Sequence, residues 1–295
     1  TLPNRVVRTG HGTGIGLGTI NDALIDYHVA RAKGGVGLTI IELLSVASSA
    51  YPFLPPHGAD LVTGYRRLMA QVQPFGMKVF QQIGHLGNEI PQADGSPPWS
   101  SSDTVGALLA VQAEPMGLRQ IAELKDGYRA AVEMVIAGGL DGVELHMAHG
   151  YMMQQFLSPL HNHRTDEYGG SFENRLRLPL EVLTMVRAML PPSMALGVRL
   201  CPELLPGGMT EADVATVAGE FRKRGLIDFV NLTLGTDYNA HKVIGAMHEP
   251  AGYEVPHAAP VRAALDLPLL VTGRFRTLEE ADQVIHEGAA DLVAL

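Results

Sequence analysis

The alternation of short apolar runs with amphipathic helical windows constrains the fold of this chain more than any other feature of its sequence. Eight runs predict β-strands, at Asn4–Arg8, Gly37–Glu42, Lys78–Gln82, Gly142–His146, Ala195–Leu200, Phe229–Leu232, Leu269–Val271 and Asp291–Leu295. The windows between them predict helices, at Asp22–Lys33, Asp60–Gln73, Ile121–Ala137, Asn174–Met189, Glu211–Arg224, Pro256–Ala264 and Leu278–Glu287. Strands and helices that alternate in this way are typical of a parallel sheet, and eight such strands favour a closed (β/α)8 TIM barrel over an open doubly wound sheet.

The composition fits a single large domain. The chain has 295 residues, of which 46% are hydrophobic and 18% are charged, enough apolar material for a sizeable core. Its 22 basic and 31 acidic residues give a net charge of −9. An acidic chain is a poor partner for nucleic acids or anionic membranes, so we expect neither.

The cysteine content and the hydropathy pattern indicate the compartment. Cys201 is the single cysteine, so the chain can form neither a disulfide framework nor a cysteine-based metal or iron–sulfur site of its own. No apolar run approaches the roughly 18 residues that a membrane span needs, and the N-terminus lacks a basic-then-apolar signal pattern. We therefore expect a soluble, cytoplasmic protein.

The last predicted strand, Asp291–Leu295, has no helix after it. A closed barrel of this class covers the outer face between its last and first strands with a helix. We therefore expect residues 1–295 to form one barrel whose polypeptide continues past Leu295, and a start before Thr1 is left open.

Three long segments follow predicted strands, at Gly84–Gly117, Gly150–Glu173 and Thr233–Val255. In such barrels the loops after the strands form the active-site face. Ser96–Ser102 would resemble a flexible linker in isolation, but its place between a strand and a helix favours a wall or lid of the site.

The strand Gly142–His146 runs into a loop that carries His149 and Tyr151. Two neutral imidazoles can donate hydrogen bonds to one substrate oxygen, and a tyrosine with an ordinary pKa of about 10 can donate a proton nearby. These three residues are the candidate catalytic group. The alternatives are a structural role for either histidine and a core position for the tyrosine.

A metal site is the competing interpretation of the same histidines. His146 and His149, with His161 or His163, could ligate a metal if the segment were helical. The strand assignment disfavours this arrangement, and no His-Glu-x-x-His motif is present. We therefore predict no metal site.

Arg199 ends an otherwise apolar strand, so its charge is expected at or inside the barrel mouth. A buried guanidinium needs an anionic partner. A reduced flavin, which is negatively charged on its pyrimidine side, would serve, and the alternative is an ion pair with Glu144.

Two glycine-containing loops are candidate ligand contacts. Val271–Arg274 resembles the phosphate loop of barrel enzymes, in which backbone N–H groups hold a dianion. Thr9–Gly16 lacks the Gly-x-Gly-x-x-Gly spacing of a dinucleotide fingerprint. It is better interpreted as a loop that lies close under a flat ligand.

Together these features resemble the Old Yellow Enzyme family of flavin oxidoreductases, in the branch that includes 2,4-dienoyl-CoA reductase and trimethylamine dehydrogenase. The resemblance covers nearly the whole chain, and its motifs are Asn4–Val7, Gly34–Leu38, Lys78–His85, Asp141–Pro159 and Arg164–Arg175. It implies an FMN-binding (β/α)8 barrel with the flavin at the C-terminal face of the strands, reduced by NAD(P)H or by the substrate.

The resemblance also implies a role for each candidate residue. Gln82 would bond the pyrimidine edge of the flavin and Arg199 would face its anionic side. The other flavin contacts would be Thr9, Gly10, His11, Gly12 and Leu43 along the ring, with Gly273 and Arg274 at the phosphate. His146 and His149 would bind the activating oxygen of the substrate, and Tyr151 would protonate the α-carbon while hydride reaches the β-carbon.

The chain departs from the family at Gly12, where other members carry a cysteine or threonine. A glycine cannot form the covalent cysteine link of trimethylamine dehydrogenase, so non-covalent FMN is expected. Larger members append an iron–sulfur cluster and a further domain, for which only sequence beyond Leu295 could provide.

The predicted function is NAD(P)H-supported reduction of a C=C bond conjugated to a carbonyl in a small molecule. Oxidative N-demethylation or amine dehydrogenation is the alternative within the family. Asp237, Tyr238, His241 and Trp99 could shape the substrate pocket in either case. A non-redox ligand-binding barrel or a metal-dependent hydrolase is the alternative of another class. The substrate, the choice between NADH and NADPH, and assembly into a homo-oligomer stay open.

Overall fold

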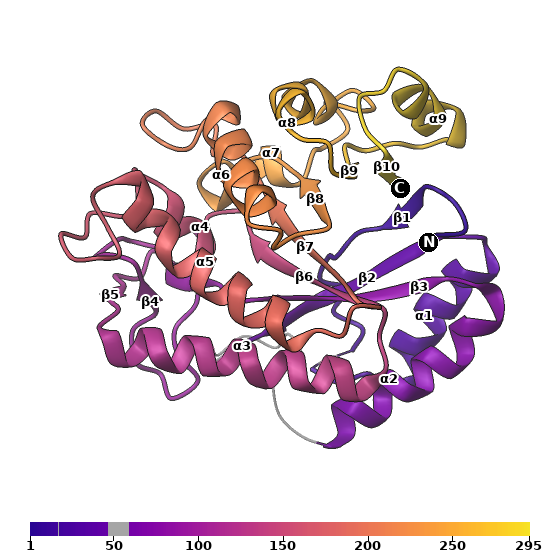
Figure 1. Ribbon diagram of the computed structural model, residues 1–295, viewed down its shortest axis with the longest axis horizontal. Coiled ribbons are helices and arrows are strands. Elements are labelled where there is room, and N and C mark those ends of the chain that lie inside the picture. The colour runs from indigo at the N-terminus through magenta and orange to yellow at the C-terminus, as the bar shows by residue number, and fades with distance from the viewer. Residues whose placement is uncertain (17, 47–58) are drawn as a thin grey trace.

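The computed structural model describes residues 1–16, 18–46 and 59–295. Its parallel strands close into a barrel in the order β1-β10-β9-β8-β7-β6-β3-β2, with the helices outside them (Figure 1). The strands are β1 (Val6–Arg8), β2 (Leu38–Ser45), β3 (Lys78–Gly84), β6 (Gly142–Met147), β7 (Ala195–Leu200), β8 (Phe229–Leu232), β9 (Leu269–Val271) and β10 (Leu292–Ala294). The predicted (β/α)8 barrel is thus confirmed.

The seven predicted helices are also present. They are α1 (Asp22–Lys33), α2 (Ala59–Val72), α3 (Leu118–Gly138), α5 (Phe172–Met189), α6 (Glu211–Lys223), α8 (Ala259–Ala264) and α9 (Leu278–His286). Side-chain caps fix two of their starts, because Thr210 accepts a hydrogen bond from the backbone N–H of Asp213 and Thr277 accepts one from that of Glu280.

Short helices lie in the loops after the strands. They are η2 (Gly87–Glu89), α4 (Met152–Leu157), η3 (Asp237–Asn239), α7 (Ala240–Val243) and η4 (Val255–Ala258), with η1 (Gln73–Phe75) extending α2. Of these, η2, α4, η3 and α7 lie within the three long segments, on the face on which a site is expected.

Two phenylalanines fill the N-terminal end of the barrel interior. The rings of Phe80 and Phe229 lie 5.7 Å apart. Gly142 and Gly197 make room for them, because a Cβ atom at Gly142 would lie 2.7 Å from the Phe80 ring and one at Gly197 would lie 2.1 Å from the Phe229 ring. Apolar packing therefore closes the barrel at the N-terminal ends of its strands, which we call the lower end.

Polar side chains occupy the opposite end of the interior. The parallel register pairs Gln82 with Glu144, His146 with Arg199, and Arg199 with Asn231. Register partners on neighbouring strands point to the same face of a sheet, and here that face is the barrel interior. The sheet thus brings a carboxylate, a guanidinium, two amides and an imidazole to the barrel mouth.

The predicted wall at Ser96–Ser102 is ordered. Within it β4 (Trp99–Ser100) pairs with β5 (Glu114–Pro115). Ser101 donates from Oγ to the backbone carbonyls of Gln155 and His161, at 2.9 and 3.0 Å. This segment is a fixed part of the loop layer.

The outer face of β1 and β10 carries a groove of about 660 Å³, lined by Val6 and Val293 and by Leu278, Ala281 and Ile285 of α9. A further helix over this face stays a prediction. Among the described helices, none combines the length and the apolar character that a membrane crossing requires.

Candidate functional site

The predicted catalytic residues come together where β6 ends. The ring centroids of His146 and His149 are 5.0 Å apart, and the Tyr151 ring lies 4.9 Å from His146 and 6.0 Å from His149. The backbone turns sharply between them, with left-handed φ values of 63° at His149 and 80° at Gly150. This turn directs all three rings into one space.

Two glutamines of α4 hold that turn in place. Gln154 accepts from the N–H of Gly150 at 2.7 Å and donates to the carbonyl of Cys201 at 2.9 Å. Gln155 donates to the carbonyl of Gly150 at 2.6 Å. Neither glutamine is among the site residues predicted from the sequence. Their signal was available, since they are adjacent amides within an apolar run.

The two histidines are neutral hydrogen-bonding groups. Burial, and then the charge of Arg199, lowers the pKa of each imidazole well below its usual value. Nδ1 of His146 accepts from the N–H of Ala148 at 3.2 Å, which places the proton of the neutral ring on Nε2. Nε2 of His149 lies 3.2 Å from Oγ1 of Thr233.

Arg199 lies 7% exposed beside this group and is held by loop atoms. It donates to the carbonyl of Gly10 at 2.8 Å and to Oγ1 of Thr233 at 3.3 Å, whereas its Nε has no partner among the described residues. A buried, half-satisfied guanidinium suits an anionic ligand.

Glu144, the alternative partner for Arg199, is engaged by two amides. Its carboxylate accepts from Nε2 of Gln82 at 2.7 Å and from Nδ2 of Asn231 at 2.8 Å. Burial raises the pKa of Glu144, while the charge of Arg199 opposes that shift. Glu144 therefore fixes the orientation of Gln82 at the barrel mouth.

A cavity of about 310 Å³ opens at the mouth. Six of the predicted cofactor residues line it, namely Thr9, Gly10, His11, Arg199, Gly273 and Arg274. The backbone approaches closely at both ends: a Cβ atom at Gly10 would lie 3.0 Å from Nε2 of Gln82, and Gly273 adopts φ 133° with its Cβ direction 3.1 Å from the backbone N of Glu254.

The other predicted cofactor residues lie beside this cavity or away from it. Gln82 is buried beneath Gly10. Leu43 packs with Leu86 and Ile90 in a small apolar cluster that also contacts Tyr151. Gly12 is exposed on the loop after β1.

The predicted substrate-pocket residues occupy different environments. Asp237 begins η3, and its N–H donates to the carbonyl of His149 at 3.4 Å. Tyr238 follows it, with its ring stacked on His161 at 5.3 Å. His241 is exposed on α7, and Trp99 packs in the core with its ring stacked on His85.

The histidines considered for a metal have other neighbours. His161 lies 3.4 Å from a carboxylate oxygen of Glu203, and His163 contacts the carbonyl of Leu160 at 2.9 Å. Within the described ranges, no group of three or more His, Cys, Asp or Glu residues is arranged to hold a metal ion.

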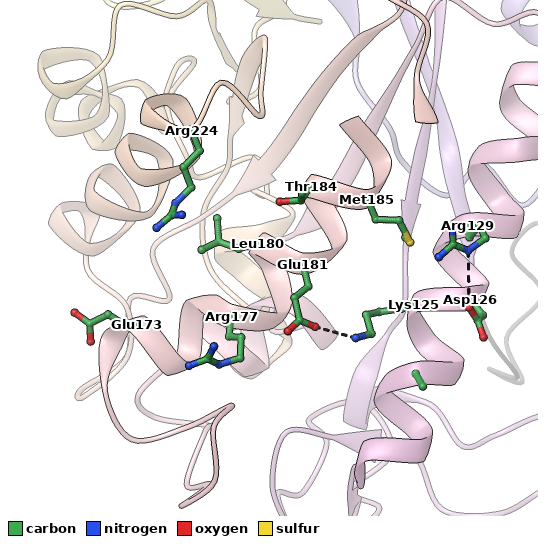
Figure 2. Close-up of a pocket in the computed structure, with 11 residues that line it drawn as sticks. Lys125, Asp126, Arg129, Glu173, Arg177, Leu180, Glu181, Thr184, Met185 and Arg224 are labelled. Carbon is green, nitrogen blue, oxygen red and sulfur yellow. Dashed lines mark hydrogen bonds and ion pairs between the residues drawn. The ribbon is translucent and has the colours of Figure 1, made fainter. Parts of the chain in front are cut away.

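A surface groove of about 750 Å³ lies outside the barrel, between α3 and α5 (Figure 2). Its charges pair across it and along α3, with Lys125 2.9 Å from Glu181 and Arg129 3.9 Å from Asp126. Ion pairs at the surface contribute little to stability, and the charges of this groove are already paired with one another. The candidate site is therefore the barrel mouth.

The mouth has the features that a bound flavin requires. Arg199, with its unpartnered Nε, can face an anionic ring, and the close backbone at Gly10 and Gly273 can lie against a flat group and its phosphate. A phenol and two neutral imidazoles beside such a cavity define the class, a flavin-dependent oxidoreductase barrel.

The chain belongs to the NADH:flavin oxidoreductase / NADH oxidase family, which matches residues 1–295. Members of this family are oxidoreductases that use FMN.

Curated relatives differ in length. An NADH oxidase of Thermoanaerobacter brockii is 30% identical over 306 residues, covering 100% of this chain and 46% of the relative. An NADPH dehydrogenase of Clostridium acetobutylicum is 29% identical, covering 94% of this chain and 81% of the relative. The chain thus spans less than half of the NADH oxidase and most of the NADPH dehydrogenase.

Solved structures share the fold. Morphinone reductase in complex with tetrahydroNAD superposes with a TM-score of 0.82 at 26% identity, covering 100% of this chain and 83% of the other. A 2-naphthoyl-CoA reductase superposes with a TM-score of 0.90 at 23% identity, covering 99% of this chain and 48% of the other.

Proposed function

We propose that this chain is the catalytic barrel of an FMN-dependent enzyme that uses NAD(P)H to reduce a C=C bond conjugated to a carbonyl. The convergence of His146, His149 and Tyr151 beside the cavity that Arg199 lines carries this proposal. The NADPH dehydrogenases and morphinone reductase among the similar proteins support it. FMN, when bound and reduced, supplies the hydride.

In this proposal the histidines bind the carbonyl oxygen of the acceptor. Nε2–H of His146 is oriented by the bond that Nδ1 accepts from Ala148, and it donates to that oxygen. His149, positioned by Thr233, provides the second contact. Because both rings are neutral, they polarise the carbonyl by hydrogen bonding and make the β-carbon electrophilic.

Tyr151 donates the proton from its phenolic oxygen to the α-carbon. The saturated bond is complete once hydride has joined the β-carbon and this proton the α-carbon, and solvent then restores the phenol. Leu43, Leu86 and Ile90 pack against Tyr151 and hold its ring toward the histidines.

The cofactor contacts follow from the same geometry. We assign Arg199 to the anionic side of the ring and Gln82 to its pyrimidine edge, since Glu144 fixes the Gln82 amide. Gly273 and Arg274, which line the cavity together with Thr9, Gly10 and His11, would hold the phosphate. By the resemblance, Thr9, Gly10, His11, Gly12 and Leu43 would lie along the ring. The glycine at position 12 supports non-covalent binding.

Oxidation of an N-methylated amine is the second candidate function. An N,N-dimethylglycine/sarcosine dehydrogenase of Chromohalobacter salexigens is 29% identical over 100% of this chain. Two acids, the buried Glu89 and the partly buried Asp237, lie near the catalytic residues and would favour a cationic substrate.

An anaerobic titration of the purified protein tests the proposal. Bleaching of the flavin absorbance by NADH or NADPH, and its return on addition of 2-cyclohexenone, would support ene reduction. Bleaching by dimethylglycine, with no response to the nicotinamides, would establish the second candidate instead. A colourless protein that takes up no added FMN would overturn both.

The remaining features of the proposal concern the setting. We propose a small-molecule substrate and a cytoplasmic location, which the single buried cysteine, Cys201, and the net charge of −9 support. Assembly into a homo-oligomer is testable by light scattering.

A further inference from the structure

Two acidic residues meet at the rim of the catalytic group from loops far apart in the sequence. Glu89 ends η2 after β3, and Asp237 begins η3 after β8. Asn88 precedes Glu89 and Tyr238 follows Asp237, and a hydrogen bond joins these two neighbours. Nδ2 of Asn88 donates to the hydroxyl of Tyr238 at 3.3 Å. That hydroxyl in turn donates to the carbonyl of Val105. The two acids are therefore held near each other by bonds that involve neither carboxylate.

Both acids also flank the catalytic residues. The backbone N–H of Asp237 donates to the carbonyl of His149 at 3.4 Å. Leu86 and Ile90, on either side of η2, pack in the cluster that contacts Tyr151. Glu89 thus lies on the tyrosine side of the catalytic group and Asp237 on the histidine side.

Each carboxylate is only half satisfied. Oε2 of Glu89 accepts from the N–H of Leu108 at 2.8 Å, whereas Oε1 of this fully buried residue has no hydrogen-bond partner among the described residues. Oδ2 of Asp237 is likewise a buried atom without a partner in the described part of the chain. No ion pair to a lysine or arginine within the described ranges reaches either acid, and the sequence of residues 47–58 contains neither cation.

Buried carboxylates without a counter-ion are costly. Burial raises the pKa of Glu89, and burial together with the charge of Glu89 raises the pKa of Asp237 to about 7. A cation bound between the two acids would lower both pKa values again, because it would supply the opposite charge that no lysine or arginine of the described residues supplies.

We propose that Glu89 and Asp237 form a cation subsite beside the His146–His149–Tyr151 group, which selects substrates that carry an ammonium group. The inference rests on the proposed function and specifies its substrate class. The aromatic stack of Tyr238 on His161 borders the pair, and an aromatic face next to carboxylates suits an alkylammonium ion. A divalent metal is a poorer fit, since Ca²⁺ takes about six to eight oxygen ligands.

The test uses two enones of the same shape, both added to the FMN-loaded protein. One is cyclohexenone with a trimethylammoniomethyl substituent, and the other carries the neutral 2,2-dimethylpropyl group instead. Dissociation constants are read from the change in absorbance of the oxidised flavin, so that binding is measured without turnover. We expect the cationic enone to bind at least tenfold more tightly.

Variants locate the preference. Glu89→Gln and Asp237→Asn keep the shape of each side chain and remove its charge, so each should reduce the tenfold ratio and the double variant should abolish it. Asp103→Asn, which removes an exposed acid from a neighbouring loop, should leave the ratio unchanged and controls for long-range electrostatics. Bound FMN verifies that each variant is folded.

The outcomes separate this inference from the proposed function. Equal dissociation constants for the two enones in the unmodified protein would overturn the cation subsite, even if both enones reoxidise the reduced flavin. A cationic preference that persists in the double variant would also overturn it. If neither enone reoxidises the flavin but the cationic one binds more tightly, the subsite stands and ene reduction fails.

Discussion

The barrel mouth and its rim differ in how they accommodate buried charge. In the mouth, Glu144 accepts from Gln82 and Asn231, and Arg199 is held by the Gly10 carbonyl and by Thr233. These charges lie inside a network of hydrogen bonds on rigid strands. On the rim, Glu89 and Asp237 each keep one carboxylate oxygen that has no partner among residues 1–16, 18–46 and 59–295.

This difference in hydrogen bonding indicates that the mouth is preorganised, whereas the charges of the rim are to be neutralised by a ligand. A network of mutual hydrogen bonds keeps its geometry when a ligand binds, as a cofactor site requires, and Nε of Arg199, which has no partner among the described residues, remains for the cofactor. An uncompensated charge gains most when a ligand of opposite sign arrives. Specificity is therefore expected to lie on the rim, and cofactor binding in the mouth.

The largest effect should come from a substitution of Tyr151, which belongs to the catalytic group between the barrel mouth and the rim. Tyr151→Phe should slow reoxidation of the reduced flavin by an enone about 10² to 10⁴-fold, the range for loss of a general acid. Reduction of the flavin by NAD(P)H should be unchanged. Stopped-flow absorbance measures both half-reactions, and an equal loss in both would contradict the role of Tyr151 as proton donor.

Breaking the network in the mouth should have the next largest effect. Arg199→Gln leaves Glu144 without the neighbouring positive charge, and loss of one member of a buried charged group costs about 3–5 kcal/mol. We expect a lower free energy of unfolding in urea and loss of FMN on dialysis. Arg187→Gln, which removes a partly exposed pair with Asp228 outside the barrel, is the control and should retain FMN.

A titratable group can also be buried in its neutral form, as His28 is. Such a group is expected to make the folded protein less stable at low pH. Burial lowers the pKa of His28 from 6.5 to about 3. Between these two pH values the imidazole is protonated in the unfolded chain and neutral in the folded chain. Stability should fall as the pH drops below 6.5, by about 2 kcal/mol between pH 7 and pH 5 for this residue.

Urea denaturation at the two pH values measures this slope. His28→Asn should flatten it, and His286→Asn, at an exposed position, should not. An unchanged slope in His28→Asn would show that His28 can be protonated in the folded protein.

The smallest effect concerns the rim in the absence of substrate. A pKa of about 7 at Asp237, against 3.8 in an unfolded chain, means that the folded protein loses stability as the pH rises between these values. Asp237→Asn should therefore raise the free energy of unfolding at pH 8 by about 1 kcal/mol, after allowance for partial exposure, and change it little at pH 4.

Asp282→Asn, at an exposed position on α9, is the matched control and should have no effect at either pH. A stability loss in Asp237→Asn at pH 8 would mean that its carboxylate has a favourable partner.

The sequence predicted the elements that depend on local pattern. Alternation of apolar residues and helix-capping residues located the eight strands and seven helices, and the end of the strand at His146 located the catalytic group. β2 is longer than predicted because Leu44 and Ser45 resume the pairing with β3 after a register shift that follows Ile41.

The missed features depend on contacts across long separations. Asn88 and Tyr238 are 150 residues apart, and Thr233 approaches His149 across 84 residues. No local pattern reveals such pairs, so Glu89 had no apparent role in the sequence. Trp99 illustrates the same limit, because its stacking on His85 depends on how a loop folds back over the barrel.

The apolar plug of Phe80 and Phe229 has a kinetic consequence. Since the lower end of the barrel is closed, every molecule that reaches the flavin arrives and departs through the same mouth. NAD(P)H and the acceptor are then expected to bind at the mouth one after the other rather than together. Steady-state rates measured at several fixed acceptor concentrations should give parallel double-reciprocal lines. An excess of NAD(P)H should inhibit binding of the acceptor, and an excess of the acceptor should inhibit binding of NAD(P)H.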